Sequence, residues 1–550
     1  MTTRKATKKQ QGYQSIGSFH NDNLVELLTQ DDATYQPPPL PFPIHDEEDE
    51  DDTKDEEALF FIDRKAWTFL NHGAFGGALR RGWERAEAWR RYAETQPLRF
   101  HDRILLPHLA HSGRVLSRFL VSPSSTTSSN HNIMTEDADY ALLPNVTSGM
   151  NAVLANYCHQ QQRHAGAPHI ILWDVTYGSV KSMARHYVQQ HHQSRGSVTE
   201  IPLVRDYLSS SSSIDATTQC SSSGEILTRA LLEHTTSSSS SSLFPMDKDG
   251  PPPLLLLDHT TSNTALTFDV KALAQAARQH IHPETWVVVD GAHGLWAHTD
   301  IGSLLASTTN NNSNHNDNPE NDSAAIDVYL TNGHKWLAAP RGVALAWARR
   351  RPNDNDKNNH NPQSLLTWPA VLSHGMHAPD VFSRFVWDGC RDYSAALAVP
   401  AVLDYWNTPL TSTTESENGT TTTRWQQGRN DVQELLWQGL AYLAQEWHGM
   451  RNSSSVSLLQ QEGFDRGILL APYEQGWLHQ APMVLMRLPR HWETKDVSTS
   501  DDAKRIQDYL YDNYVEVPIK CVEGKLYVRV SCHVYNRMED FARLAHVLKQ

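Results

Sequence analysis

Short apolar runs alternate with amphipathic stretches through the central part of the chain. The runs are rich in large aliphatic and β-branched residues, which favours strands, and the stretches carry apolar residues at helical spacing. The expected strands are 169–173, 254–257, 286–290, 326–330 and 343–347, and the expected helices are 83–93, 150–162, 180–190 and 270–280. Because strands that alternate with helices form a parallel sheet covered on both faces, this region predicts an α/β fold.

After residue 387 the pattern changes to longer helices with fewer strands between them. The expected helices are 395–406, 431–447, 502–512 and 538–548, and the expected strands are 483–488 and 526–531. This composition predicts a smaller C-terminal α+β domain. We therefore expect three parts: a disordered acidic segment at 1–57, a large domain at 58–390 and a small domain at 391–550.

Polar tracts of low complexity interrupt this pattern. They lie at 122–139, 209–223, 235–242, 307–323, 352–363 and 411–423. Each tract stands between segments that look ordered, so we interpret the tracts as surface-loop insertions, which a fold tolerates because loop-closure entropy grows slowly with length. The N-terminal 57 residues combine a proline cluster with an acidic run, a composition that buries too little apolar surface to fold.

Composition and charge narrow the class of protein. The chain has 550 residues and a net charge of −15, of which −9 comes from 46–57, where ten acidic residues accompany one lysine. No basic stripe indicates nucleic-acid binding. The five cysteines are scattered and lack a CxxC motif, which is typical of a reducing compartment. No run approaches the roughly 20 apolar residues of a membrane span. We expect a cytoplasmic protein; a transit peptide within residues 1–21, which hold four basic and no acidic residues, is the alternative.

The candidate chemistry centres on a lysine in a turn between two apolar runs. Lys335 lies in the segment 331–337, which contains a glycine and a tryptophan, and partial burial there would lower the pKa of its amine. Asp290 ends an upstream β-branched strand, and His293 follows three residues later. A strand-end carboxylate, an imidazole and a later lysine form the polar set that pyridoxal phosphate requires, since the carboxylate pairs with the pyridine nitrogen and the lysine forms a Schiff base.

A phosphate site and a ring-covering residue are also available. Thr147 and Ser148 stand where a loop opens the helix near 150, and free N–H groups at a helix start bind anions. An ordinary helix N-cap is the alternative. Tyr177 follows the strand at 169–173 and offers an aromatic ring to cover the pyridine, although a core tyrosine would need no such role. Ligands of parallel sheets bind at the carboxyl ends of the strands, where these residues lie.

Four segments together resemble motifs of the class V aminotransferases of the pyridoxal-phosphate fold type I. They are 69–76, 290–293, 333–336 and 529–531. The match runs in order from about residue 66 to 550, and its branch is the isopenicillin N epimerase-like group, which includes hercynylcysteine sulfoxide lyase. The resemblance implies a large domain with a seven-stranded, mainly parallel sheet, a smaller C-terminal α+β domain, and a homodimer with its sites at the subunit interface.

The resemblance also implies roles for individual residues. Arg529 matches the arginine that binds the substrate α-carboxylate, with Asn71 and His72 as further substrate-binding residues. For cofactor binding, the resemblance implies that Thr147, Ser148 and His334 hold the phosphate and that Tyr177 stacks on the ring. Asn263 would approach the 3-hydroxyl, with Ser262 as the alternative for that position. Asp290, His293 and Lys335 are implied both in cofactor binding and in catalysis. Two positions depart from the family: Asn332 replaces a hydroxyl residue and Cys390 replaces a threonine, which puts their phosphate contacts in doubt.

The function implied is a pyridoxal-phosphate enzyme that acts on an amino acid through an external aldimine. A C–S β-lyase acting on a cysteine conjugate or sulfoxide is favoured, and an epimerase or a transaminase is the alternative. A cysteine desulfurase would need a suitably placed thiol, for which Cys521 and Cys532 are the candidates near Arg529. A scaffold that has lost catalysis is a further alternative. A metal site is not indicated, because the 29 histidines include no HExxH motif and no paired ligand spacing on one helix.

Overall fold

The computed structural model describes most of the chain between Leu24 and Lys549. The described ranges are 24–43, 59–121, 138–163, 166–191, 196–208, 222–236, 251–298, 301–306, 325–351, 363–378, 380–410, 422–450, 455–478, 482–493 and 495–549. Most of the polar tracts predicted to be loop insertions lie outside these ranges. None of the described helices is long and apolar enough to cross a membrane.

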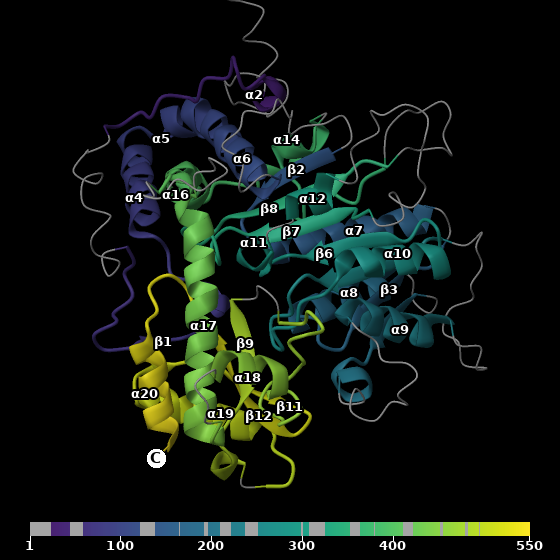
Figure 1. Cartoon of the computed structure of the whole chain (residues 1–550). Helices are drawn as coiled ribbons and strands as arrows, with labels where there is room; N and C mark the ends of the chain where they lie inside the picture. The colour runs from purple at the N-terminus through teal and green to yellow at the C-terminus, as the bar shows by residue number, and fades with distance from the viewer. Residues whose placement is uncertain are drawn as a thin grey trace, which may run out of the picture.

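A seven-stranded sheet forms the centre of the larger part of the molecule (Figure 1). Its order is β2-β8-β7-β6-β5-β3-β4, and β8 runs antiparallel to both of its neighbours while the remaining pairs are parallel. The strands are β2 (Ala138–Leu143), β3 (His169–Trp173), β4 (Ser197–Ile201), β5 (Leu254–Asp258), β6 (Trp286–Asp290), β7 (Val328–Asn332) and β8 (Ala344–Arg349). The predicted α/β fold with a mainly parallel seven-stranded sheet is therefore confirmed.

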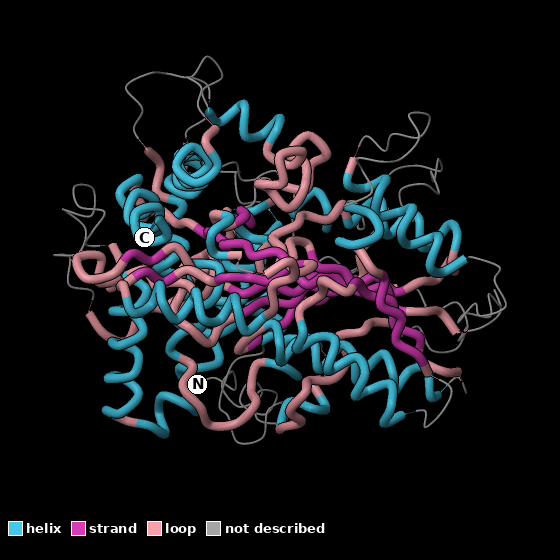
Figure 2. The backbone as a smooth tube through the Cα atoms, turned by 90° about the horizontal axis from the view of Figure 1, so that it is seen from below, coloured by secondary structure: helices cyan, strands magenta, loops and turns pink. Residues whose placement is uncertain are grey.

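The central strands are apolar throughout because both of their faces are covered. Leu255 and Val287 join one hydrophobic cluster, while their neighbours Leu256 and Val288 join a second cluster on the opposite face. Figure 2 shows the strands as a middle layer with helices on either side. The helices that contribute to the second cluster are α7 (Val146–Arg163) and α8 (Gly178–His191), and those of the first include α6 (Leu105–Val121), α9 (Ser223–Thr236) and α10 (Val270–His280).

The C-terminal part builds a small antiparallel sheet of order β11-β12-β9. Its strands are β9 (Met483–Arg487), β11 (Ile519–Val522) and β12 (Lys525–Ser531), and its helices are α17 (Arg424–His448), α18 (Ser455–Glu462), α19 (Ser500–Asp512) and α20 (Met538–Lys549). Figure 1 shows the long helix α17 extending from α16 alongside this sheet. The N-terminal strand β1 (Thr68–Phe69) pairs with β10 (Val515–Glu516), so a segment before the large sheet belongs spatially with the C-terminal part. The domain limits at 57 and 390 remain a prediction.

Further helices lie in the described part of the chain. They are α2 (Leu24–Thr29), α3 (His72–Phe75), α4 (Arg80–Thr95), α5 (Pro97–Arg99), η2 (Phe100–Ile104), η3 (Val204–Leu208), α11 (Gly294–Ala297), α12 (Ile301–Ala306), η5 (His374–His377), α14 (Val381–Phe385), α15 (Ser394–Leu397), α16 (Val399–Asn407) and η6 (Arg490–Trp492).

Three sequence-based expectations need correction. The helix expected at 395–406 is divided into α15 and α16, because Pro400 lies in the first turn of a new helix, where its missing N–H costs nothing. The expected disorder does not extend through 24–43, where Arg114 of α6 donates hydrogen bonds to the carbonyls of Leu27 and Leu28 at the end of α2. Strand β2 begins at Ala138, inside a stretch interpreted as a polar loop.

Candidate active site

Lys335 occupies the turn between β7 and β8. Its Nζ lies 3.1 Å from Nε2 of His293. Burial lowers the pKa of Lys335 to about 8, the negative charge of Asp290 opposes this shift, and the positive charge of Arg529 adds to it. An amine with this pKa is partly neutral near pH 7, which is the form that attacks a carbonyl carbon.

His293 is held in one tautomer by the residue next to Lys335. The indole Nε1–H of Trp336 donates to Nδ1 of His293 over 3.2 Å, so Nδ1 is an acceptor. Burial keeps the pKa of His293 well below its usual range, so the ring is neutral and its proton is on Nε2. That N–H points at the lone pair of the neutral Lys335 amine. Trp336 thus orients His293, a contact that the sequence analysis did not predict.

Asp290 ends β6 next to a second carboxyl group. Asp258 ends β5 and is the register partner of Asp290, so both side chains belong to the carboxyl edge of the sheet. Burial raises the pKa of both groups; Asp290 raises that of Asp258 further, while the Ala292 N–H and Lys335 favour the charged form of Asp290. Oδ1 of Asp290 accepts the Ala292 N–H over 3.0 Å. A cationic ring nitrogen at Asp290 would relieve the repulsion between the two carboxyl groups.

The N-terminal segment 70–79 packs against the backbone of the turn that contains Lys335. Nε2–H of His72 donates to the Lys335 carbonyl over 3.0 Å, and Nδ1 accepts the Tyr535 hydroxyl over 2.9 Å. His72 is completely buried, and burial lowers its pKa to about 3. The substrate contact expected of His72 stays a prediction. In this structure its neutral ring holds the backbone of Lys335 in position.

Gly76 packs against the backbone of this turn. It has φ of +70°, and a Cβ atom there would lie 2.6 Å from the His334 carbonyl oxygen. Gly76→Ala is expected to lower the free energy of unfolding by about 3 kcal/mol, since it adds a backbone clash to an unfavourable conformation. Urea unfolding with Gly449→Ala as the control separates the two effects, because Gly449 has φ of +69° and nothing within 4 Å of its would-be Cβ. Equal losses in both variants would contradict the clash.

Arg529 projects from β12 into the same region and is 3% exposed. Its Nη1 donates to the Ser262 carbonyl, and its Nη2 donates to Oδ1 of Asn71 over 3.1 Å. Both partners are neutral, and within the described part of the chain Nε has no partner and no carboxylate forms an ion pair with the guanidinium. A buried guanidinium without a counter-ion is suited to binding a carboxylate from outside the chain.

The start of α7 is tied to the strand that leads to Lys335. Oδ1 of Asn332 accepts the Val146 N–H over 3.1 Å, and Oδ1 of Asn145 accepts the Ser148 N–H over 2.8 Å. The helix cap and the predicted anion site therefore coincide, with Thr147 at the exposed tip. Asn332, which departs from the family pattern, serves to dock the helix. His334 donates Nδ1–H to the Val343 carbonyl over 3.2 Å.

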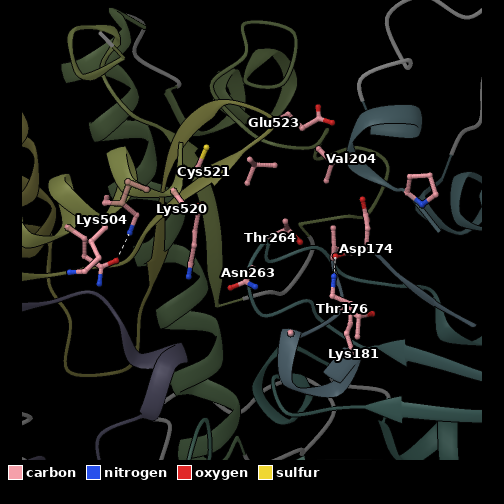
Figure 3. A pocket seen from close by; sticks show the side chains of 18 residues that line it. Asp174, Thr176, Lys181, Val204, Asn263, Thr264, Lys504, Lys520, Cys521 and Glu523 are labelled. Carbon is pink, nitrogen blue, oxygen red and sulfur yellow. Dashed lines mark hydrogen bonds between the residues drawn. The ribbon is translucent and has the colours of Figure 1, made fainter. Parts of the chain in front are cut away.

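A cavity of about 940 Å³ lies between the ends of β3 and β5 and the edge of the small sheet, and of the residues predicted for the site it is lined by Asn263. Asn263 and Thr176 line it from the large domain, and Lys520 lines it from β11 (Figure 3). Tyr177, 44% exposed, precedes α8 at the same edge, and its backbone N–H stabilises the charged form of Asp258. Asn263 is exposed, whereas its neighbour Ser262 contributes the carbonyl that holds Arg529.

The comparisons with known proteins agree with this geometry. No protein-family model matches the chain. The "Probable L-cysteine desulfhydrase, chloroplastic" of Arabidopsis thaliana is 24% identical over 493 residues, covering 86% of this chain and 81% of that protein. "Isopenicillin N epimerase" of Amycolatopsis lactamdurans is 23% identical over 316 residues, covering 54% and 59%. A solved structure of C-DES with glycine linked to its PLP cofactor shares the fold, with a TM-score of 0.50, 15% identity and coverage of 88% and 96%.

Three findings agree with the resemblance seen in the sequence. They are the order of the strands in the sheet, the position of the lysine turn opposite a strand-end aspartate, and the relatives that span most of the chain. The chain thus resembles the class V aminotransferases of pyridoxal-phosphate fold type I: it shares the fold of C-DES and is similar in sequence to an L-cysteine desulfhydrase and an isopenicillin N epimerase.

Proposed function

We propose that this protein is a pyridoxal-phosphate-dependent C–S β-lyase that acts on L-cysteine or an S-substituted L-cysteine. The observation that carries the proposal is that the Lys335 amine lies within range of the charges of the buried Asp290 carboxyl and of the Arg529 guanidinium, which has no carboxylate partner in the described part of the chain. Among the relatives, the desulfhydrase that matches over most of the chain is named for releasing sulfur from cysteine.

The residues of the site fit the cofactor. Lys335 would hold its aldehyde carbon, Asp290 its ring nitrogen, and the N-terminus of α7 with Thr147 and Ser148 its phosphate. The carboxyl group of Asp290 would provide negative charge to a protonated ring nitrogen. The start of α7 would provide the positive end of a helix dipole to the phosphate. When bound, the cofactor withdraws electrons from the substrate Cα.

The protein residues then have defined tasks. Arg529 binds the substrate carboxylate in two-point fashion, which fixes the direction of the Cα–H bond. The neutral Lys335 amine accepts the Cα proton, and Nε2–H of His293 orients that amine. The electron pair of the C–H bond forms a double bond to Cβ as the C–S bond breaks and the thiolate leaves. With one water, the products are a thiol, pyruvate and ammonium.

A persulfide-forming desulfurase is disfavoured by the positions of the described cysteines. Cys521 lines the cavity, but it faces away from Arg529, because it is paired with Leu526 and alternates with Lys520 along β11. Its thiol donates to the Ser498 carbonyl. Cys532 is fully buried, which raises the pKa of its thiol well above the usual range. Cys390 lies against His101, outside the cavity that contains Asn263. Cys220 lies outside the described residues.

Product analysis tests the proposal against its alternatives. The cofactor-loaded protein is incubated with L-cysteine and with S-substituted L-cysteines, and we expect pyruvate, ammonium and the free thiol in equal amounts. Epimerisation, suggested by the relative from Amycolatopsis lactamdurans, would instead give the D-amino acid with the C–S bond intact. Transamination would give a sulfur-containing keto acid. Either of those products in place of pyruvate would refute the lyase proposal. The implied homodimer and cytoplasmic location remain predictions.

The pKa of Lys335 predicts how cofactor capture depends on pH. The amine reacts only when neutral, so the rate at which the apoprotein captures pyridoxal phosphate should rise as pH increases through about 8 and level off above it. The measurement is the rate of appearance of borohydride-fixed label on Lys335 by peptide mass spectrometry. A midpoint near 10.5, the usual value for an exposed lysine, would contradict the burial of this amine.

A further inference from the structure

Lys520 faces the same direction as the arginine of the active site. It is the register partner of Tyr527, and Arg529 lies two residues farther along β12. Directly opposed residues of an antiparallel pair, and residues two apart on one strand, share a face, so Lys520 and Arg529 project from the same face of the small sheet. Figure 3 shows the Lys520 amine directed to the side of Asn263, with the Cys521 thiol pointing the opposite way.

The charge on Lys520 has no counter-ion. It is partly buried, and in the described part of the chain no carboxylate pairs with its Nζ. Burial lowers its pKa, and the nearby positive charge of Arg529 lowers it further. Two neighbouring cations that share a face, each without a carboxylate partner, incur a desolvation cost that an anionic ligand would offset.

The other two lysines of the cavity differ from Lys520 in this respect. Lys181 forms an ion pair with Glu200, and Lys504 forms one with Asp508. Their charges are satisfied within the chain. Lys520 is therefore the lysine of this cavity whose charge remains available to a ligand.

The cavity has room for more than cysteine. Its volume is about 940 Å³. Sites of roughly 300–1,000 Å³ bind ligands of drug size. A substrate whose α-carboxylate is held by Arg529 could extend its S-substituent past Asn263 into this space.

We propose that Lys520 binds a second carboxylate, located on the S-substituent of the substrate, and that the preferred substrates are L-cysteine conjugates with an acidic S-substituent. This inference rests on the proposed lyase function and names its substrate class. Elimination from such a conjugate, with one water, yields an acid-bearing thiol, pyruvate and ammonium, so no further reactant is needed.

The test compares S-carboxymethyl-L-cysteine with its neutral isostere S-carbamoylmethyl-L-cysteine. The wild-type enzyme should favour the acidic conjugate by about tenfold in kcat/KM, the value of one hydrogen bond to a charged group. Lys520→Met should bring the ratio close to one, and Lys520→Arg should restore the preference. Lys504→Met, which removes an exposed lysine of the same cavity, should keep the wild-type ratio.

A binding measurement separates this inference from the proposed function. The increase in melting temperature caused by each conjugate is recorded for the wild-type protein and for Lys520→Met. A larger increase with the acidic conjugate, lost in Lys520→Met, supports the inference even if no pyruvate forms and the lyase proposal fails. Equal turnover and equal stabilisation by both conjugates in the wild-type protein would overturn the inference and leave the lyase proposal intact.

Discussion

Replacing Lys335 with alanine is expected to reduce pyruvate release by about a thousandfold or more, because one amine both holds the cofactor and carries the Cα proton. The side chain that is hydrogen-bonded to this amine is the neutral ring of His293, whose Nδ1 accepts from Trp336, so the ring is a poor substitute for it. The measurement is steady-state pyruvate release with saturating cofactor, accompanied by borohydride reduction and peptide mass spectrometry.

Lys335→Ala should remain folded, since it removes a buried amine whose charged form is disfavoured. A melting temperature close to that of the wild type would show that the loss of activity is chemical. Borohydride should label the wild-type peptide that contains Lys335 and leave the variant unlabelled. Label on another lysine, with activity retained in the variant, would refute the assignment of Lys335.

Replacing Arg529 with methionine is expected to lower kcat/KM by about a hundredfold, mostly through KM. The guanidinium offers two or more hydrogen bonds to the substrate carboxylate, each worth about 1.5–3 kcal/mol. Arg529→Lys should recover little of this, because a lysine ammonium cannot reproduce the planar two-point contact. The variants are compared on L-cysteine and on cysteamine, which lacks the carboxylate, and the preference of the wild-type enzyme for cysteine should disappear in Arg529→Met.

Arg487 provides the matched control for this experiment. It lies on β9 of the same sheet but pairs with Glu493. Arg487→Met should leave the preference for cysteine unchanged. Arg529→Met should not be destabilised, since it removes a buried cation that has only neutral partners. An unchanged preference for cysteine in Arg529→Met would show that another group binds the carboxylate.

Local pattern was sufficient to predict the fold and to name candidates for the reactive residues. The apolar runs ending at Asp290 and preceding Lys335 are strands, because only an interior strand tolerates such a run, and the carboxyl ends of parallel strands meet at one edge. Element limits were less accurate. The strand expected to begin at 326 begins at Val328, and a proline divided the helix expected at 395–406.

The sequence by itself determined the α/β architecture. It also supplied the candidates for the reactive lysine, its aspartate and the carboxylate-binding arginine, since each depends on local periodicity or on an ordered motif. Only the tertiary structure decided which neighbours these residues have. It buried His72 behind the lysine turn, set the tautomer of His293 through Trp336, and placed Lys520 beside Arg529. These relations join residues far apart in the chain, and burial, tautomer and charge pairing arise only when separate elements pack together.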